Sequence, residues 1–330
     1  MRTAILELLK HNSGQYISGE DISHMLKVSR TAVWKHIRAL KQAGYEIEAH
    51  PRLGYALRQT TDRLLPGEIE AHLTSSVLGR NIHYYGELDS TNNEAKELAA
   101  NGCPEGTIVI AEAQVTGRGR LARGWFSPSG KGIWLSIVLR PPFSPMEAAK
   151  CTLMAAVGVN RAINTVTGTG CGIKWPNDIL WNGRKVVGIL TEMSAEMDAI
   201  NYVVIGMGIN VNIEQQDFPS EIAASATSLA VAAGCQISRV KLLTAILAEL
   251  EGVYTTVKNF GFAPVLEEWK KQSITLGQLV DVHGIERSFS GLAVDIDADG
   301  ALLIKTSQGI ERVLAGDVSI RPSTSSVLKL

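Results

Sequence analysis

Apolar residues recur at helical spacing three times near the start of the chain. These stretches predict helices over 1–11, 18–26 and 29–41. Two short alternating stretches then flank a Pro/Gly turn, and they predict a β-hairpin over 45–57. Helix, turn, helix and hairpin in this order predict a winged helix-turn-helix. The expected N-caps of the second and third helices are Ser18 and Ser29.

The outer face of the third expected helix is basic. Residues 27–41 hold five Lys or Arg and no Asp or Glu. Charged helix faces are often merely solvated, but the complete winged unit with this face favours DNA binding. Its side chains have the reach for either phosphates or base edges, and the sequence does not decide between the two. The residues expected at DNA are Thr31, Lys35, Arg38 and, at the hairpin tip, Arg52.

The middle of the chain mixes both periodicities. Asn182-Gly183 between apolar runs predicts a hairpin, and long apolar stripes predict helices. Residues 90–92 stand where a helix through 100 can be capped. The expected strands are 81–86, 107–113, 132–139, 179–181, 185–190 and 202–212, and the expected helices are 90–100, 147–166 and 240–260.

From about residue 273 the chain changes to short strands separated by turns, which is typical of a small barrel. The expected strands are 278–282, 287–295, 301–305 and 311–314. The whole chain is therefore expected to be a multidomain α+β protein. The expected domains are residues 1–62, 63–272 and 273–330.

Composition bounds these expectations. Of 330 residues, 45% are hydrophobic and 20% charged, as in globular proteins, and no segment resembles a signal peptide or a membrane span. We expect a cytoplasmic protein without a membrane partner. The net charge of the chain is −1, yet residues 1–60 hold nine Lys or Arg against five Asp or Glu. This local excess of positive charge again predicts that the N-terminal region binds a polyanion. Four cysteines without a C-x-x-C pair favour free, mostly buried thiols and no bound metal.

A Gly/Arg-rich segment lies between two expected strands, over residues 114–125. Its glycines let the backbone approach a ligand, and its arginines suit carboxylate or phosphate. The segment taken alone fits a solvated loop equally well. No phosphate-binding G-x-x-x-x-G-K-[ST] pattern occurs, and residues 167–172 lack the dinucleotide spacing and are expected to form a turn. A kinase or a Rossmann dehydrogenase is therefore disfavoured.

A second informative segment is Lys174-Trp175-Pro176-Asn177-Asp178. It can be a proline-broken strand that only enters the following hairpin. The hairpin would also bring Lys185 back beside Asp178, and a lysine next to a carboxylate stays charged and oriented.

These segments, taken in order, resemble the biotin protein ligase family, in its bifunctional form. The resemblance covers nearly the whole chain, and the order and spacing of its motifs are specific. It rests on Ser90-Thr91-Asn92, Gly117-Arg118-Gly119-Arg120, the segment 174–178, Lys185 with Gly188, and Gly206-Met207-Gly208-Ile209-Asn210. It implies a central domain of the class II synthetase/biotin-lipoate ligase type and an SH3-like C-terminal barrel. In the family loop a glycine often stands where this chain has Ala122.

The resemblance implies a reaction in two steps. Biotin and ATP would form biotinyl-5'-AMP with Mg²⁺, and a lysine of a carboxylase's biotin carboxyl-carrier domain would then take the biotin. Lys185, Arg120 and Asp178 are the implied catalytic residues. The implied biotin contacts are Ser90, Thr91, Asn92 and Gln114, with Arg118, Gly119, Arg120 and Lys185 along the carboxylate and phosphate and Asn210 at the nucleotide.

Regulation follows from the same resemblance. Bound biotinyl-AMP would order the Arg/Gly loop and favour a homodimer that spans two half-sites of operator DNA. Three alternatives compete with the bifunctional enzyme: a lipoate ligase, a ligand-sensing regulator without catalysis, and an enzyme whose DNA-binding domain is vestigial. Retention of Arg120, Asp178 and Lys185 weighs against a pure sensor.

Overall fold

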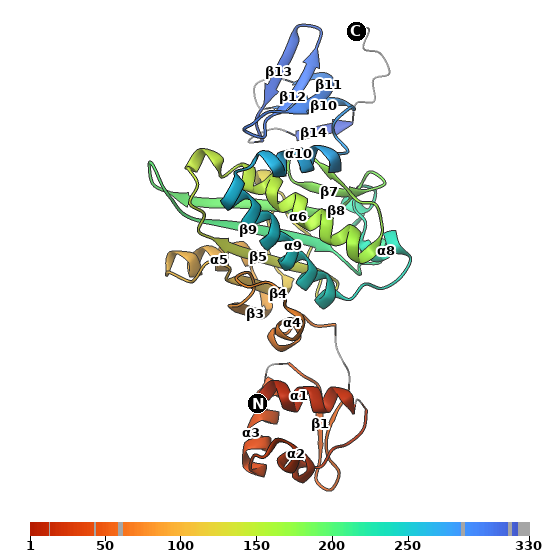
Figure 1. The fold of residues 1–330 in the computed structure, drawn as a ribbon. Helices are drawn as coiled ribbons and strands as arrows, with labels where there is room; N and C mark the ends of the chain where they lie inside the picture. The colour runs from red at the N-terminus through yellow and green to blue at the C-terminus, as the bar shows by residue number, and fades with distance from the viewer. Residues whose placement is uncertain (13, 43, 59–61, 285–287, 316–318, 323–330) are drawn as a thin grey trace. The chain divides into compact units, whose positions relative to one another are not determined.

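The computed structural model describes the chain except residues 13, 43, 59–61, 285–287, 316–318 and 323–330 (Figure 1). The chain divides into two compact units, residues 1–71 and 72–330. Each unit is described by itself.

The N-terminal unit contains the three expected helices and the hairpin. Ser18 Oγ accepts a hydrogen bond from Asp21 N at 3.0 Å, and Ser29 Oγ accepts one from Ala32 N at 3.2 Å, so both predicted caps are confirmed. The elements are α1 Arg2–His11, α2 Gly19–Leu26, α3 Arg30–Gln42, β1 Ile47–His50, β2 Gly54–Leu57 and α4 Pro66–His72. The short helix α4 was not predicted, because Ile69 is its one buried residue and a single apolar position has no period.

The hairpin is held close to the helices at Gly54. The φ of Gly54 is +101°, and a Cβ on this residue would lie 2.1 Å from the Ile17 carbonyl oxygen. The neighbouring backbone explains the crowding, since Ile17 and Tyr55 exchange two N–H···O hydrogen bonds at 2.9 Å. A glycine is therefore required where the wing joins the start of α2.

The second unit is built on a seven-stranded sheet with the order β3-β4-β5-β9-β8-β7-β6. β3 and β4 are parallel, and the other neighbours are antiparallel. The strands are β3 Ile82–Leu88, β4 Ile108–Gln114, β5 Gly132–Leu139, β6 Gly172–Lys174, β7 Asp178–Trp181, β8 Arg184–Ala195 and β9 Ile200–Asn210. β8 extends five residues beyond its predicted end, because its long pairing with β9 continues to Ala195.

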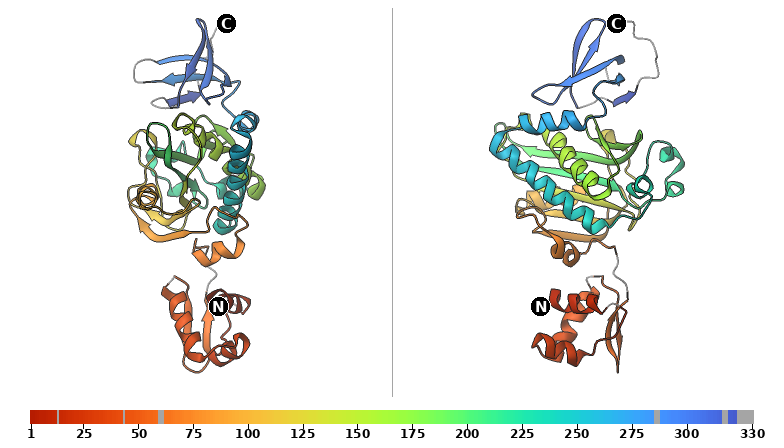
Figure 2. Two further views of the ribbon diagram at one scale, coloured as in Figure 1. Left: turned by 60° about the vertical axis from the view of Figure 1, so that its left-hand side comes forward. Right: turned by 45° about the vertical axis from the view of Figure 1, so that its right-hand side comes forward.

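Helices cover the two faces of this sheet (Figure 2). On one side, α5 packs its Ala95 and Ala99 against Val109, Val138 and Val204 from three strands. On the other side lie α6 and α9, which pack on each other along their length. The helices are α5 Thr91–Ala100, α6 Lys150–Thr167, α7 Ser220–Ala223, α8 Leu229–Ala233, α9 Arg239–Phe260 and α10 Ala263–Gln272.

Two details of the helices differ from expectation. Ser90 occupies the N-cap position of α5, within the segment 90–92 expected there, but its side chain makes no capping hydrogen bond. The N–H of Thr91 instead donates to Gln114 Oε1 at 2.9 Å, which satisfies the first turn from another strand. Residues 145–147 form a short 3₁₀ turn, and α6 therefore begins at Lys150 rather than at 147.

The C-terminal region is a five-stranded antiparallel sheet with the order β13-β12-β11-β10-β14. Trp175, 1% exposed, donates its indole N–H to the Gly300 carbonyl at 3.0 Å and so joins this sheet to the larger one. The strands are β10 Leu279–His283, β11 Ser288–Ile296, β12 Leu302–Thr306, β13 Gly309–Val313 and β14 Ser319–Pro322. β14 was not predicted, and the predicted strand 287–295 begins at a residue outside the described part of the chain.

Among the described residues, no helix combines the length and apolar character needed to cross a membrane.

A carboxylate clamps the start of the second unit to α9. Glu251 on α9 accepts backbone N–H groups from Ser76 at 2.5 Å and from Val77 and Leu78 at 2.7 and 2.8 Å. Burial raises the pKa of Glu251, but these hydrogen bonds outweigh burial, and its pKa is lowered overall.

We predict that Glu251→Gln lowers the free energy of unfolding by about 1–3 kcal/mol at neutral pH, since the amide loses the charge and an acceptor. A lowered folded pKa stabilises the fold above the unfolded pKa of about 4.3. The difference between wild type and variant should therefore vanish as pH falls through the folded pKa. Denaturant titration at several pH values measures it. The exposed Glu97→Gln is the control, and a difference that does not depend on pH would contradict the assignment.

Candidate functional site

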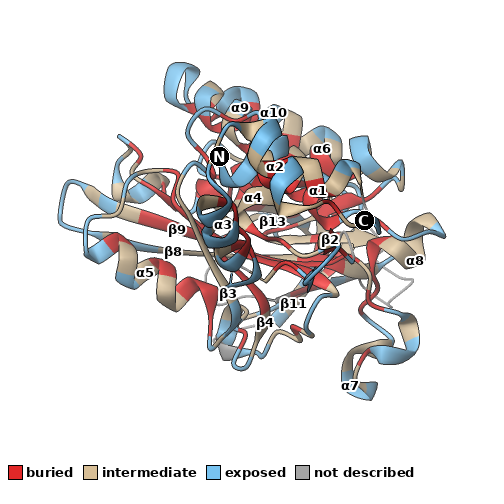
Figure 3. Cartoon of the chain, turned by 90° about the horizontal axis from the view of Figure 1, so that it is seen from below, coloured by how far each residue is buried: buried red, intermediate tan, exposed pale blue. Residues whose placement is uncertain are grey.

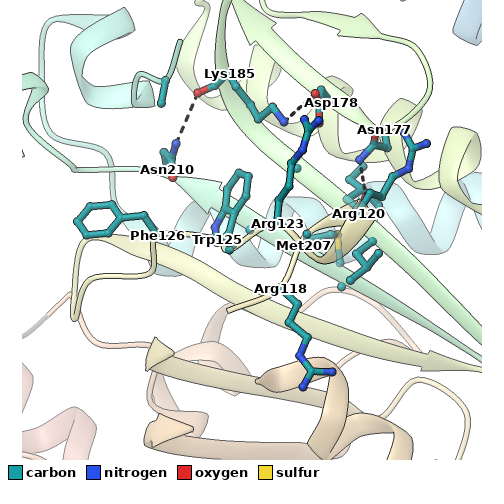
Figure 4. A pocket seen from close by; sticks show the side chains of 18 of the residues that line it. Arg118, Arg120, Arg123, Trp125, Phe126, Asn177, Asp178, Lys185, Met207 and Asn210 are labelled. Carbon is teal, nitrogen blue, oxygen red and sulfur yellow. Dashed lines mark hydrogen bonds and ion pairs between the residues drawn. The ribbon is translucent and has the colours of Figure 1, made fainter. Parts of the chain in front are cut away.

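One cavity of about 440 Å³ in the second unit brings together distant segments of the chain. It is bordered by the N-terminus of α5, the loop after β4, the β7–β8 hairpin, β9 and residues of β14. Figure 4 shows the side chains of some of the residues that line it. Every predicted ligand residue lies here: Ser90, Thr91, Asn92, Gln114, Arg118, Gly119, Arg120, Asp178, Lys185 and Asn210.

The floor of the cavity depends on glycines in β8 and β9. A Cβ at Gly208 would lie 2.3 Å from Trp125 Nε1, and one at Gly188 would lie 2.6 Å from the same indole ring. A Cβ at Gly206 would lie 2.0 Å from Asn92 Oδ1. These glycines are therefore needed for close side-chain approach and not for turns.

The predicted pairing of Lys185 with Asp178 is confirmed. Lys185 Nζ lies 2.8 Å from Asp178 Oδ2, across the β7–β8 hairpin. Asp178 is mostly buried, and its Oδ1 has no hydrogen-bond partner in the described part of the chain. The Lys185 ammonium also lies 5.9 Å from the centroid of the Trp125 ring, within range of a cation–π contact. The lysine is charged, oriented and accessible to an anion.

Backbone contacts hold Lys185 as well. Its N–H donates to the Ser225 carbonyl at 2.8 Å, and its carbonyl accepts from Thr227 N at 3.0 Å. Asn210 Nδ2 donates to the Thr227 carbonyl at 3.1 Å. The amide of Asn210 thus braces the segment 225–227 at the cavity wall.

Arg120 connects the Gly/Arg loop to two other segments. Its guanidinium donates to Asn177 Oδ1 at 3.0 Å and to the Ala315 carbonyl. Arg118 is exposed and points away from Lys185, whereas Arg123 points toward Asp178 (Figure 4). Leu121 holds the left-handed conformation of this loop, with φ 55°.

Sequence reasoning missed several residues that border the cavity. Lys174 lines it as a further cation, and burial lowers the pKa of this lysine while Asp178 opposes the shift. Trp125 and Arg123 also line it, as does Arg321 from β14. Lys174 lies in the segment 174–178, and Trp125 and Arg123 lie in the Gly/Arg-rich segment 114–125, so their positions in the sequence could have identified them. Nothing in the sequence around Arg321 pointed to the cavity.

The residues expected at DNA are exposed in the N-terminal unit. Thr31, Lys35 and Arg38 lie along the outer side of α3, whose exposure is visible in Figure 3. Arg52 at the hairpin tip and Thr31 border one groove between α3 and the wing. The turn is shaped by His50, whose Nδ1 accepts the N–H groups of Arg52 and Leu53 at 3.3 and 3.2 Å. The structure therefore places all four on the accessible surface.

Metal-ligand clusters are not found in the described residues: no group of three or more His, Cys, Asp or Glu side chains converges there. Cys151 and Cys171 are buried free thiols, Cys103 is half-buried and Cys235 is exposed.

Three segments of the chain match known families. Residues 85–210 match the biotin/lipoate A/B protein ligase family, residues 2–56 a helix-turn-helix domain, and residues 275–321 the biotin protein ligase C-terminal domain.

Known proteins resemble nearly the whole chain. The bifunctional ligase/repressor BirA of Bacillus subtilis (strain 168) is 42% identical over 97% of this chain and 98% of that protein. The protein of the same name from Escherichia coli (strain K12) is 28% identical over 94% of each chain. The biotin protein ligase from Aquifex aeolicus, solved with biotin and ATP, superposes with a TM-score of 0.65 and 30% identity, covering 74% of this chain and all of that one.

Proposed function

The chain belongs to the biotin protein ligase family, and from that premise we propose that it is a bifunctional member, an enzyme that also represses transcription. It is an ATP-dependent biotin protein ligase with an N-terminal DNA-binding domain. One observation carries the enzymatic function: the residues implied by the resemblance, scattered from position 90 to 210, all line one cavity with Lys185 and Arg120 inside it. The functional domains we propose are residues 1–62, 63–272 and 273–330.

The first step joins two anions. A biotin carboxylate oxygen attacks the α-phosphorus of ATP, the bond to the β-phosphate oxygen breaks, and pyrophosphate leaves. Charge builds on the phosphorus, and the cations Lys185 and Arg120 offset it, joined by Arg118 once the loop turns that side chain toward Lys185. Asp178 keeps Lys185 aimed into the cavity through its 2.8 Å ion pair. No protein nucleophile takes part.

Binding roles follow from the cavity's two ends. Ser90, Thr91 and Gln114 form a polar, largely buried end that suits the ureido ring of biotin. Asn92 belongs to the same end. Gly119 and the arginines lie toward the carboxylate, and Asn210 braces the segment beside the nucleotide. Mg²⁺ enters as the Mg·ATP substrate and neutralises phosphate charge.

The second step transfers biotin to protein. A carrier lysine attacks the acyl carbon of biotinyl-AMP, an amide forms, and AMP leaves. The acceptor is the biotin carboxyl-carrier domain of acetyl-CoA carboxylase or a related carboxylase. The proposed location is the cytoplasm, where this carrier and the operator are both present, and no membrane partner is involved.

Mass spectrometry of a carrier domain incubated with the protein, ATP, Mg²⁺ and biotin tests the enzyme. We expect one added biotinyl group with biotin and none with lipoate, which separates this enzyme from a lipoate ligase. Lys185→Ala should lower adenylate formation by on the order of 10²–10³, the usual loss of one such charge-stabilising group. The exposed Lys241→Ala is the control. No product with either acid, despite biotin binding, would favour a ligand-sensing regulator.

The DNA-binding role rests on the basic face of α3 and the wing. Thr31, Lys35, Arg38 and Arg52 are exposed together in one unit and meet the polyanion there. We predict that Arg38→Ala weakens binding to the operator and lowers the slope of log K against log salt by about 1. Arg2→Ala, on α1, serves as the control. An electrophoretic shift with the gene's own upstream region measures both. Failure of the wild type to shift it at low salt would indicate a vestigial domain.

The repressor acts as a homodimer when biotinyl-AMP is bound. Each subunit carries one winged unit, so a dimer reaches two half-sites while a monomer reaches one. The adenylate contacts the Arg/Gly loop and orders it for pairing of two second units. Sedimentation velocity with biotin and Mg·ATP should show a dimer, and without them a monomer. The same monomer under both conditions would contradict this mechanism.

A further inference from the structure

A chain of hydrogen bonds runs from the surface of β8 to the polar end of the cavity. Lys96 Nζ lies 2.6 Å from Glu192 Oε1, and Asn92 Nδ2 donates to Glu192 Oε2 at 2.8 Å. On the other side of the same amide, Ser136 Oγ lies 2.6 Å from Asn92 Oδ1. Ser136 Oγ also lies 2.8 Å from Thr91 Oγ1. No function proposed above uses Glu192 or Ser136.

Both N–H groups of Asn92 and one lone pair of its Oδ1 are already used within the protein. Its Oδ1 accepts from Ser136 and its Nδ2 donates to Glu192 and, at 3.4 Å, to the Leu190 carbonyl. The residue is 5% exposed, and it lies on the Gly206 backbone, where a Cβ would collide with its amide. Asn92 therefore serves first as a link in this series of hydrogen bonds, whatever contact it also makes with biotin.

The direction of each bond in the chain is set from Glu192. A carboxylate only accepts hydrogen bonds, so the amide of Asn92 must turn its NH₂ toward Glu192 and its oxygen toward Ser136. Ser136 has one hydroxyl proton, and it goes to Asn92 Oδ1, which can only accept. The neighbours of the Thr91 hydroxyl are then both acceptors, Ser136 Oγ at 2.8 Å and Gln114 Oε1 at 3.2 Å. The Thr91 hydroxyl therefore donates its proton to one of these two protein acceptors, and both lone pairs of its oxygen stay available to accept hydrogen bonds from a ligand.

Gln114 is oriented by the same segment. Its Oε1 accepts the N–H of Thr91 at 2.9 Å, so its NH₂ group lies on the side away from Thr91. One N–H of that group donates to Ser127 Oγ at 3.0 Å, which leaves the other for a ligand. The polar end of the cavity therefore offers an acceptor on Thr91 beside a donor on Gln114. A cyclic urea, with N–H groups next to a carbonyl, has the complementary pattern.

We propose that Glu192 is a positioning residue for substrate recognition, which sets the acceptor state of Thr91 through Asn92 and Ser136 and so selects a cyclic urea. The inference rests on the proposed function, because it names the residue that orients the biotin-binding end of the same site.

Burial and charge both fit this role. Asn92, Ser136 and Thr91 are 5%, 0% and 4% exposed, so water cannot replace a misdirected partner. Glu192 itself is about a third exposed. Burial raises the pKa of Glu192, but hydrogen bonds from Lys96 and Asn92 outweigh it and lower the pKa, which keeps the carboxylate ionised near neutral pH. A substitution here changes the direction of bonds at little cost in packing.

Glu192→Gln is the direct test. The amide can present its own NH₂ to Asn92, which lets Asn92 turn over and passes the Ser136 proton to Thr91. The KM for biotin should rise about tenfold, the effect of one misdirected hydrogen bond, while kcat and the KM for ATP stay within about twofold. Ser136→Ala leaves the Thr91 hydroxyl held only by its 3.2 Å contact with Gln114 Oε1, so it should also raise this KM, and it keeps the inference testable if Glu192→Gln does not fold.

Two further variants separate direction from charge. Lys96→Met removes the ion pair but leaves an acceptor-only carboxylate, so its KM for biotin should stay near that of the wild type. Glu94→Gln is the matched control. Glu94 lies on α5, as Asn92 and Lys96 do, and accepts a hydrogen bond from Tyr85 at 2.7 Å, outside the series of hydrogen bonds from Glu192 to Thr91. Unfolding temperatures are recorded for all four variants.

Several outcomes would overturn the inference. They are an unchanged KM for biotin in Glu192→Gln, an equal rise in Lys96→Met, or a loss of kcat and of thermal stability together, which marks a purely structural residue. A wild-type protein that does not turn over biotin would instead refute the proposed function, and the wild-type assay distinguishes that result from the others.

Discussion

The chemistry of the site depends on the ion pair across the β7–β8 hairpin. An exposed lysine is a mobile charge, and an anionic ligand must then order it at an entropic cost. Here Asp178 is held in the sheet and Lys185 lies 2.8 Å from it, while backbone hydrogen bonds to Ser225 and Thr227 fix the strand beneath. The cation is therefore positioned before any ligand arrives, which is what stabilises charge in a transition state.

A second constraint holds the Gly/Arg loop at both of its ends. Arg239 at the start of α9 donates to Glu112 Oε2 at 2.9 Å and to the Gly132 carbonyl at 3.0 Å. Glu112 lies in β4 just before the loop, and Gly132 begins β5 just after it. The pair is 2% and 3% exposed, so removal of either partner would leave a buried charge uncompensated. Arg239 thus joins the two strands between which the Gly/Arg loop lies.

The two ends of the cavity solve different problems. At the end proposed to bind the anionic groups of the substrates, the cations come from several elements. Arg120 contacts both Asn177 and the Ala315 carbonyl there, so the C-terminal region contributes to the cavity wall. At the other end, Ser90, Thr91 and Gln114 are uncharged, and discrimination there depends on which atoms donate and which accept. That pattern is produced by buried hydrogen bonds that begin at Glu192.

The sequence by itself determined most of the local elements and named residues that all line one cavity. An apolar run that ends at Pro141-Pro142 located β5 at Gly132–Leu139 as predicted, and the Asn-Gly turn located the hairpin that pairs Lys185 with Asp178. Both rest on short-range rules, since an apolar run and a turn are set within a few residues. The helices α4 and α10 were not predicted. The first is too short for a periodic signal, and the second buries only Val265, Leu266 and Trp269 over its ten residues.

Only the tertiary structure decided what each site residue can do. Asn92 was expected to contact a ligand, but Glu192, 100 positions away in sequence, occupies its amide. Residues 90–92 were expected to cap α5, and Ser90 does hold the N-cap position, but the hydrogen bond to that helix end comes from Gln114 in β4. Arg120 reaches a carbonyl 195 positions away. Hydrogen-bond capacity is finite and is used up by whichever groups lie nearest in space, and sequence spacing carries no record of partners brought together by sheet pairing and helix packing.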